Sequence, residues 1–244
     1  MKLERLYSKI FPKKFGPYWN KIKTNPNLDE DIKKITNAFI NSESYNYVST
    51  WWHVLNIKNF KSLAEEGVSK YGTNISTSYY TFFDLSNDYL GASFENIKDS
   101  LDIKLNGELF KIQNGINYKE SLFYNSICLL LYENLKKTKY LNHLKQLNDN
   151  TYLGFNDPFI KIDGTNVSTD KIVSLFDLEN INKFNNLENV NSILEIGAGS
   201  GRLSECILTF YNKINYVVCD IPPALYISYY RLKKAFPEKK ISIL

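Results

Sequence analysis

Residues 192–201 read SILEIGAGSG, an apolar run that leads into a loop with glycine at every second position. The apolar run suits a buried strand of a parallel sheet. Gly197, Gly199 and Gly201 let the backbone turn sharply and let a ligand approach it closely. Apolar residues at helical spacing follow from Arg202 to Leu208, so the free N–H groups of a helix N-terminus would face the same ligand. This stretch predicts a strand, a ligand-binding loop and a helix in succession.

A second strand is predicted at Tyr216–Cys219, and Asp220 stands at its C-terminal end. In doubly wound α/β folds the carboxyl ends of the strands hold the ligand, and an acidic residue about 20 positions after the glycines can bind ribose hydroxyls. Asp220 has this place in the sequence. The two strands together predict half of a nucleotide-type site.

The spacing of the glycines separates two classes of ligand. The dinucleotide fingerprint G-x-G-x-x-G needs a third glycine at position 202, where the chain has Arg202. The pattern Glu-x-Gly-x-Gly-x-Gly, from Glu195 to Gly201, instead resembles motif I of class I S-adenosylmethionine-dependent methyltransferases. An incidental glycine-rich turn is the alternative. The strand, the glycine spacing, the following helix and the acidic Asp220 all match the methyltransferase pattern instead.

The resemblance implies a cofactor, S-adenosylmethionine, and a role for each matching residue. The glycines would lie under the methionine part of the cofactor, Glu195 would orient the loop, and Asp220 would bind the two ribose hydroxyls. The implied cofactor-binding residues are Glu195, Gly197, Ala198, Gly199, Gly201, Asp220 and Ile221.

The flanks of the motif resemble a narrower group, the sugar O-methyltransferase family. The similar segments are Gly154–Phe159, Ile162–Gly164, Val167–Asp170 and, after the second strand, Asp220–Tyr230 with its prolines and tyrosines. The resemblance covers at best about residues 152–236. It implies a sugar, nucleotide-sugar or glycoconjugate acceptor. This implication rests on the flanking segments alone, because they include no acceptor-site or catalytic motif.

The expected fold class is α/β, with a mainly helical N-terminal region followed by the first part of a Rossmann-like methyltransferase sheet. We expect three parts: a helical cap or substrate region over 1–150, a lead-in hairpin and helix over 151–191, and the partial cofactor-binding domain over 192–244. Apolar spacing and breakers predict helices at 28–40, 54–71, 87–105, 119–137 and 170–184, and a hairpin turn at Asp163-Gly164. The aromatic stretch 75–85 is left unassigned.

Two strands make a poor parallel sheet, because such strands need neighbours and cover on both faces. Ile241–Leu244 reads as the start of a third strand. We therefore expect the 244 residues to be a fragment of a longer protein. If the chain is complete, a second copy or a partner finishes the sheet, which leaves a homo-oligomer open, or the chain is a non-catalytic relative.

Composition favours a cytoplasmic protein. Hydrophobic residues make up 43%, and no apolar run approaches the roughly 18 residues that cross a bilayer. The first residues lead into no apolar signal-peptide core. Cys128, Cys206 and Cys219 stand in apolar settings without a C-x-x-C pair, so we expect reduced core thiols rather than disulfides or zinc.

The formal net charge is +4 and is uneven along the chain. Basic residues dominate the first 23 positions, with aromatic residues between them. Such a segment can meet a phosphate-bearing partner, but an arm docked by its aromatic residues is the favoured interpretation. Lys and acidic residues alternate elsewhere, so no nucleic-acid groove is expected.

Methyl transfer to a hydroxyl needs a base close to the reacting oxygen. The histidines are His53, after Trp51-Trp52, and His143, among leucines; packing is the favoured role for both. Asp157 and Asp170 are weaker acceptor-side candidates. No cluster has metal-ligand spacing, and we name no catalytic residue.

The expected function is transfer of a methyl group from S-adenosylmethionine to a hydroxyl of a sugar or glycoconjugate. Two alternatives stay open. One is a methyltransferase for another small molecule. The other is a non-catalytic interaction module in which the glycine loop is a relic, although the presence of Asp220 argues mildly against it.

Overall fold

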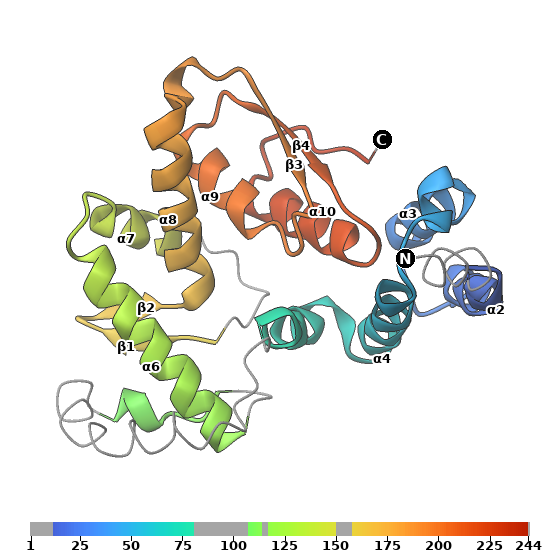
Figure 1. The fold of residues 1–244 in the computed structure, drawn as a ribbon, viewed down its shortest axis with the longest axis horizontal. Helices are drawn as coiled ribbons and strands as arrows, with labels where there is room; N and C mark the ends of the chain where they lie inside the picture. The colour runs from blue at the N-terminus through green and yellow to red at the C-terminus, as the bar shows by residue number, and fades with distance from the viewer. Residues whose placement is uncertain (1–11, 81–106, 114–116, 150–157, 244) are drawn as a thin grey trace, which may run out of the picture. The chain divides into compact units, whose positions relative to one another are not determined.

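The computed structural model describes residues 12–80, 107–113, 117–149 and 158–243 (Figure 1). The chain divides into two compact units. The first, termed the loop unit, contains the chain up to Tyr71 together with Leu194–Gly201 and the residues from Val217 onward. The second, termed the hairpin unit, contains Gly72–Ile193 and Arg202–Tyr216. Each unit is described by itself.

Within the described residues the fold is α/β, with eight α-helices and two small sheets of two strands each. The α-helices are α2 (Pro12–Lys23), α3 (Glu30–Asn41), α4 (Thr50–Tyr80), α6 (Tyr118–Leu135), α7 (Leu141–Asp149), α8 (Thr169–Phe184), α9 (Arg202–Phe210) and α10 (Ala224–Ala235). Short 3-10 helices are η1 (Glu43–Asn46), η2 (Glu108–Phe110) and η3 (Leu187–Asn189). The strands are β1 (Ile160–Ile162), β2 (Thr165–Val167), β3 (Ser192–Ile196) and β4 (Asn215–Cys219). The predicted helices at 28–40, 119–137 and 170–184 are confirmed, and the one at 87–105 lies outside the described residues.

Helices α3 and α4 show how single residues set helix geometry. Oδ1 of Asp29 accepts a hydrogen bond from the backbone N–H of Ile32 at 2.9 Å, which satisfies a free donor of the first turn of α3. The helix α4 leaves helical geometry at Gly67, where φ is 77° and ψ is 172°. The sequence placed the end of this helix at Gly72; that prediction is wrong, because the break comes at Gly67 and the helix then resumes to Tyr80.

Aromatic side chains form the core of the loop unit. Trp19 of α2 is fully buried, and its indole N–H donates a hydrogen bond to Nδ1 of His53 at 3.1 Å. Phe15 stacks on the His53 ring with centroids 5.1 Å apart. Phe39 and Phe60 meet Trp19 edge-on. In its described part the basic N-terminal segment is therefore a helix docked by its aromatic residues, as predicted.

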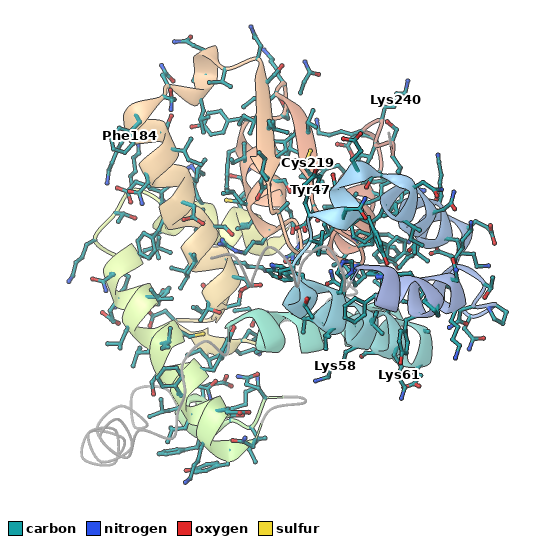
Figure 2. All side chains as sticks on the ribbon, turned by 45° about the vertical axis from the view of Figure 1, so that its right-hand side comes forward. Tyr47, Lys58, Lys61, Phe184, Cys219 and Lys240 are labelled. Carbon is teal, nitrogen blue, oxygen red and sulfur yellow. The ribbon has the colours of Figure 1, made fainter. Side chains whose placement is uncertain are left out.

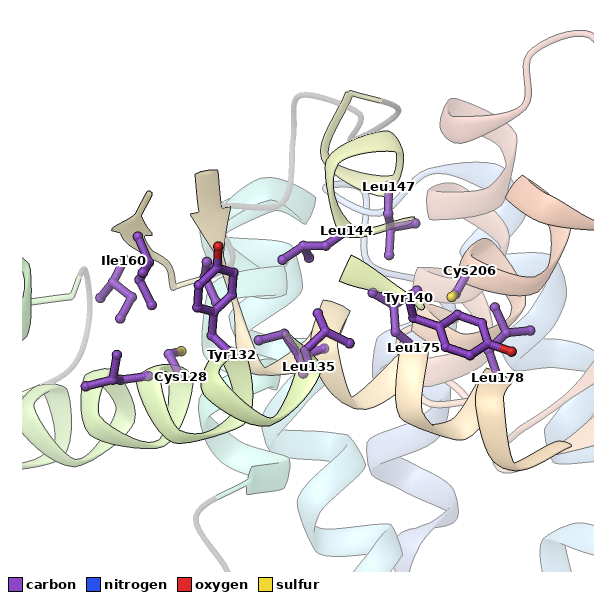
Figure 3. Packing of buried hydrophobic residues seen from close by; sticks show 14 of the residues in the cluster. Cys128, Tyr132, Leu135, Tyr140, Leu144, Leu147, Ile160, Leu175, Leu178 and Cys206 are labelled. Atoms are coloured by element: carbon purple, nitrogen blue, oxygen red, sulfur yellow. The ribbon is translucent and has the colours of Figure 1, made fainter. Parts of the chain in front are cut away.

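The hairpin unit has an aliphatic core built on α6, α7, α8 and α9 (Figure 3). Leu135, Leu144 and Leu175 are fully buried there, one from each of the first three helices. Cys206 of α9 is also buried. In the loop unit, Lys58 and Lys61 of α4 are exposed (Figure 2).

The strands β1 and β2 form an antiparallel hairpin in which Ile160 pairs with Val167. Asp163 and Gly164 make the turn, with φ of 50° and 74°. A two-residue type I′ turn needs positive φ at both positions, which Asp-Gly provides. The predicted turn is confirmed.

The strands β3 and β4 lie side by side (Figure 1). The backbone N–H of Asn215 donates to the carbonyl of Asn191 at 2.9 Å, and that of Gly197 donates to the carbonyl of Cys219 at 2.8 Å. Both bonds advance in the same direction along the two strands, so the pair is parallel, with α9 as the connection between them.

One face of this strand pair is open. Ile193 and Tyr216 pack against the core of the hairpin unit, whereas Leu194, Ile196 and Val217 are 60%, 81% and 45% exposed. The prediction that Leu194 and Ile196 belong to a buried strand is wrong, because no described residue covers this face. The expected third strand is also wrong for residues 241–243, which have no strand structure. Membership of a larger Rossmann-like sheet stays a prediction.

Arg202 opens α9 at the position where a dinucleotide fingerprint has glycine. Its guanidinium donates to Oγ of Ser174 at 2.9 Å and to Oδ2 of Asp177 at 3.0 Å, both on α8. This side chain is therefore a link between two helices of the hairpin unit.

Candidate functional site

The glycine loop lies in the loop unit between β3 and α9. The φ angles of Gly197, Gly199 and Gly201 are 76°, 59° and 74°. Residues with a Cβ rarely adopt this backbone region. A Cβ built on Gly197 or Gly199 meets no atom within 4 Å. Backbone conformation therefore requires these glycines, and the space beside two of them is open.

The structure brings Asp220 to this loop. Its Oδ2 accepts a hydrogen bond from the N–H of Gly199 at 2.6 Å, and its Oδ1 accepts one from the N–H of Ile221 at 2.7 Å. Each carboxylate oxygen has two lone-pair sites, so each can still accept a further bond. The two halves of the motif, 21 residues apart, meet in one place.

Two opposing effects act on the charge of Asp220. Burial raises the pKa of this carboxyl, and the hydrogen bonds from Gly199 and Ile221 act in the opposite direction. Burial penalises the charged form, whereas a bond from an N–H group favours it. The net direction is upward, so the pKa of this carboxyl is raised from its ordinary value.

The helix α10 supports the loop from another side. The hydroxyl of Ser228 lies 2.8 Å from the carbonyl oxygen of Gly199, and Nη1 of Arg231 lies 3.3 Å from Oγ of Ser200. Both Ser228 and Arg231 are buried. The sequence interpretation missed them, although Ser228 and Arg231 share the helical spacing of the buried Ala224 and Ile227, which is a signal for polar groups on an inward face.

The N-terminal part of α3 meets α10 within the same unit. The hydroxyl of Tyr226 donates to Oδ2 of Asp29, whose other oxygen caps α3. One turn on, the hydroxyl of Tyr229 lies 3.2 Å from Oδ2 of Asp31. Burial, and then the bond to Asp29, raise the pKa of Tyr226. The helix that supports the glycine loop is therefore also tied to α3.

The other predicted binding residues have less defined places. Ala198 is buried in the loop, whereas Glu195 of β3 and Ile221 after β4 are half-buried. The orientation of the loop by Glu195 stays a prediction.

The histidines pack, as expected. His53 is 1% exposed inside the aromatic core, where burial lowers its pKa. The ring of His143 lies 4.5 Å from that of Phe210 in the hairpin unit. Asp170 is buried on α8 with Oδ1 free of hydrogen bonds, and Asp157 lies outside the described residues.

The cysteines are only partly as predicted. Cys128 and Cys206 are buried free thiols, and burial raises the pKa of Cys128 to about 12. Cys219 is exposed on β4 (Figure 2), so the prediction of a core thiol is wrong there. It lies on the same open face as Val217.

No group of His, Cys, Asp and Glu among the described residues could hold a metal ion. No helix in the described ranges is both long and apolar enough to span a bilayer. No protein-family model, curated protein or solved structure matches the chain.

Proposed function

We propose that the glycine loop and Asp220 form an S-adenosylmethionine site, and that the chain belongs to a methyltransferase that acts on a hydroxyl of a sugar or glycoconjugate. The observation that carries the proposal is the pairing of Gly199 with Asp220. It joins a loop with an open side to the Asp220 carboxylate, whose oxygens can each accept a further hydrogen bond. A ligand with a ribose and a charged tail suits this combination of groups.

The residues present fit such a ligand. The open space at Gly197 and Gly199 admits a close approach to the backbone. The free lone pairs of Asp220 can accept the two ribose hydroxyls while the N–H groups of Gly199 and Ile221 hold the carboxylate in place. When bound, S-adenosylmethionine supplies an activated methyl group. We propose no base for the acceptor.

Two further parts of the proposal rest on sequence resemblance. The pair β3 and β4, joined through α9, would be the first part of a Rossmann-like sheet, and its parallel direction supports this. The sugar or glycoconjugate acceptor rests on the segments that flank the motif, among them Asp220–Tyr230.

A second candidate is an interaction module without catalysis. The open apolar face with Leu194, Ile196 and Val217 favours it, because contiguous exposed apolar surface often marks a binding surface. In that case the glycine loop would bind no adenosyl ligand.

Calorimetric titration with S-adenosylhomocysteine tests the proposal. We compare the wild-type chain with Asp220→Asn and with the matched control Asp163→Asn in the β1–β2 turn, where Asn tolerates the positive φ. We expect Asp220→Asn to lose about 1–3 kcal/mol of binding free energy, because the amide carries no negative charge and its NH2 group cannot accept a hydrogen bond. The control should bind like the wild type. No binding by the wild type, or equal binding by both variants, contradicts the proposal.

A further inference from the structure

The hydroxyl of Ser228 makes a contact that a helical serine does not need. It lies 3.1 Å from the carbonyl of Ala224, the back-bond that any serine within a helix can form with the preceding turn. It lies closer, at 2.8 Å, to the carbonyl of Gly199 in the glycine loop. Ser228 is fully buried, so water does not replace this partner. The hydroxyl thus reaches from α10 to the loop.

Gly199 is held at both of its backbone polar groups. Its N–H donates to Asp220, and its carbonyl accepts from Ser228. The φ of 59° keeps it in a conformation that is costly for other residues, and the space beside its Cα is open. One peptide of the loop is therefore fixed from two sides and open on a third.

A second contact from α10 reinforces the first. Arg231 lies three residues after Ser228, on the same side of the helix. Its Nη1 is 3.3 Å from Oγ of Ser200, the next residue of the loop. The buried face of α10 therefore contacts two successive loop residues.

We propose that Ser228 is a positioning residue for the glycine loop: its hydroxyl fixes the Gly199 carbonyl, so that the loop is ordered before a ligand arrives. A preorganised loop loses less conformational freedom on binding. That the ligand is an adenosyl compound rests on the proposed function. The ordering of the loop does not, because it concerns the ligand-free chain.

The test uses two variants of Ser228 and one control. Ser228→Ala removes the hydroxyl. Ser228→Cys replaces the hydroxyl by a somewhat larger thiol that is only a weak donor. The control, Ser126→Ala, removes an equally buried serine of α6 whose hydroxyl bonds the Leu122 carbonyl at 2.8 Å, the ordinary helical back-bond. Hydrogen–deuterium exchange of loop amides 199–201 is measured without ligand, and affinity for S-adenosylhomocysteine by titration.

We expect Ser228→Ala to speed exchange of the loop amides about tenfold and to weaken binding about three- to tenfold, as for one lost hydrogen bond. Ser228→Cys should fall between it and the wild type, and it carries the test if the alanine variant does not fold. Ser126→Ala should leave both loop exchange and binding unchanged. A purely structural role would move the unfolding midpoint without this local change in exchange.

The outcomes separate this inference from the proposed function. Loop exchange at the wild-type rate in both Ser228 variants overturns the positioning role, whatever the affinities are. If the Ser228 variants show faster loop exchange but the wild type binds no adenosyl ligand, the positioning role is supported and the proposed function is refuted. Faster exchange together with weaker binding supports both.

Discussion

The backbone N–H of Gly199 donates a hydrogen bond to Oδ2 of Asp220 at 2.6 Å, across 21 residues of sequence. The orientation of the carboxylate and the conformation of the loop therefore depend on each other. A change at either residue should affect both the loop and whatever ligand it binds.

Gly199→Ala should abolish tight binding of S-adenosylhomocysteine. A Cβ at φ 59° costs about 1 kcal/mol of stability, and it would occupy the open side of the loop. Gly164→Ala in the β1–β2 turn is the matched control, because φ is 74° there and the Cβ also meets no atom. Both variants should lose similar stability in urea unfolding, but only Gly199→Ala should lose affinity. Equal affinities of Gly199→Ala and Gly164→Ala for S-adenosylhomocysteine would show that the loop is not part of the binding site.

Binding should weaken in mild acid. A ribose hydroxyl needs the ionised form of Asp220, and the pKa of this carboxyl is raised by burial, so affinity should fall at a higher pH than for an ordinary aspartate, whose pKa is about 3.9. Protonation relieves the burial of the charge, so this group adds stability as pH falls through its raised pKa. Titrations across this range should show the decline in the wild type and none in Asp220→Asn. A pH-independent affinity in the wild type contradicts this role of Asp220.

Tyr226→Phe should destabilise the loop unit by about 1–2 kcal/mol. The change removes the donor to Oδ2 of Asp29 and leaves the bond from Ile32 that caps α3 in place. Tyr47→Phe is the control, because Tyr47 is 84% exposed in the same unit (Figure 2). Urea unfolding measures both. Equal unfolding free energies for the two variants would show that the contact between α3 and α10 does not stabilise the unit.

The motif and the local elements could be predicted from the sequence because short-range chemistry determines them. Asp163-Gly164 makes the predicted turn, and the glycine spacing marks the loop. The contact of Ser228 with Gly199 could not be predicted, since nothing in a helical periodicity tells which distant carbonyl a buried hydroxyl meets.

The prediction that Ile196 is buried is wrong for a different reason. An apolar run predicts a strand, but it does not tell whether another element covers each face of that strand. The structure leaves Ile196 81% exposed.

The open face can be tested by a matched pair of substitutions. Ile196→Ala should change the free energy of unfolding by less than about 0.5 kcal/mol, as at an exposed position. Ile172→Ala in α8 removes the same atoms from a fully buried site and should cost about 2–5 kcal/mol. Chemical denaturation of both variants measures the difference. A large loss at Ile196 would mean that this face is covered in solution.

The most direct test of the site measures whether Asp220 binds a ribose hydroxyl. S-adenosylhomocysteine and its 2′-deoxy analogue are titrated into the wild type and into Asp220→Asn. We expect loss of the 2′-hydroxyl to weaken binding about tenfold in the wild type and hardly at all in Asp220→Asn, because the hydroxyl and the Asp220 carboxylate interact with each other. Equal losses in both proteins, or no binding of either ligand to the wild type, would contradict an adenosyl site at Gly199 and Asp220.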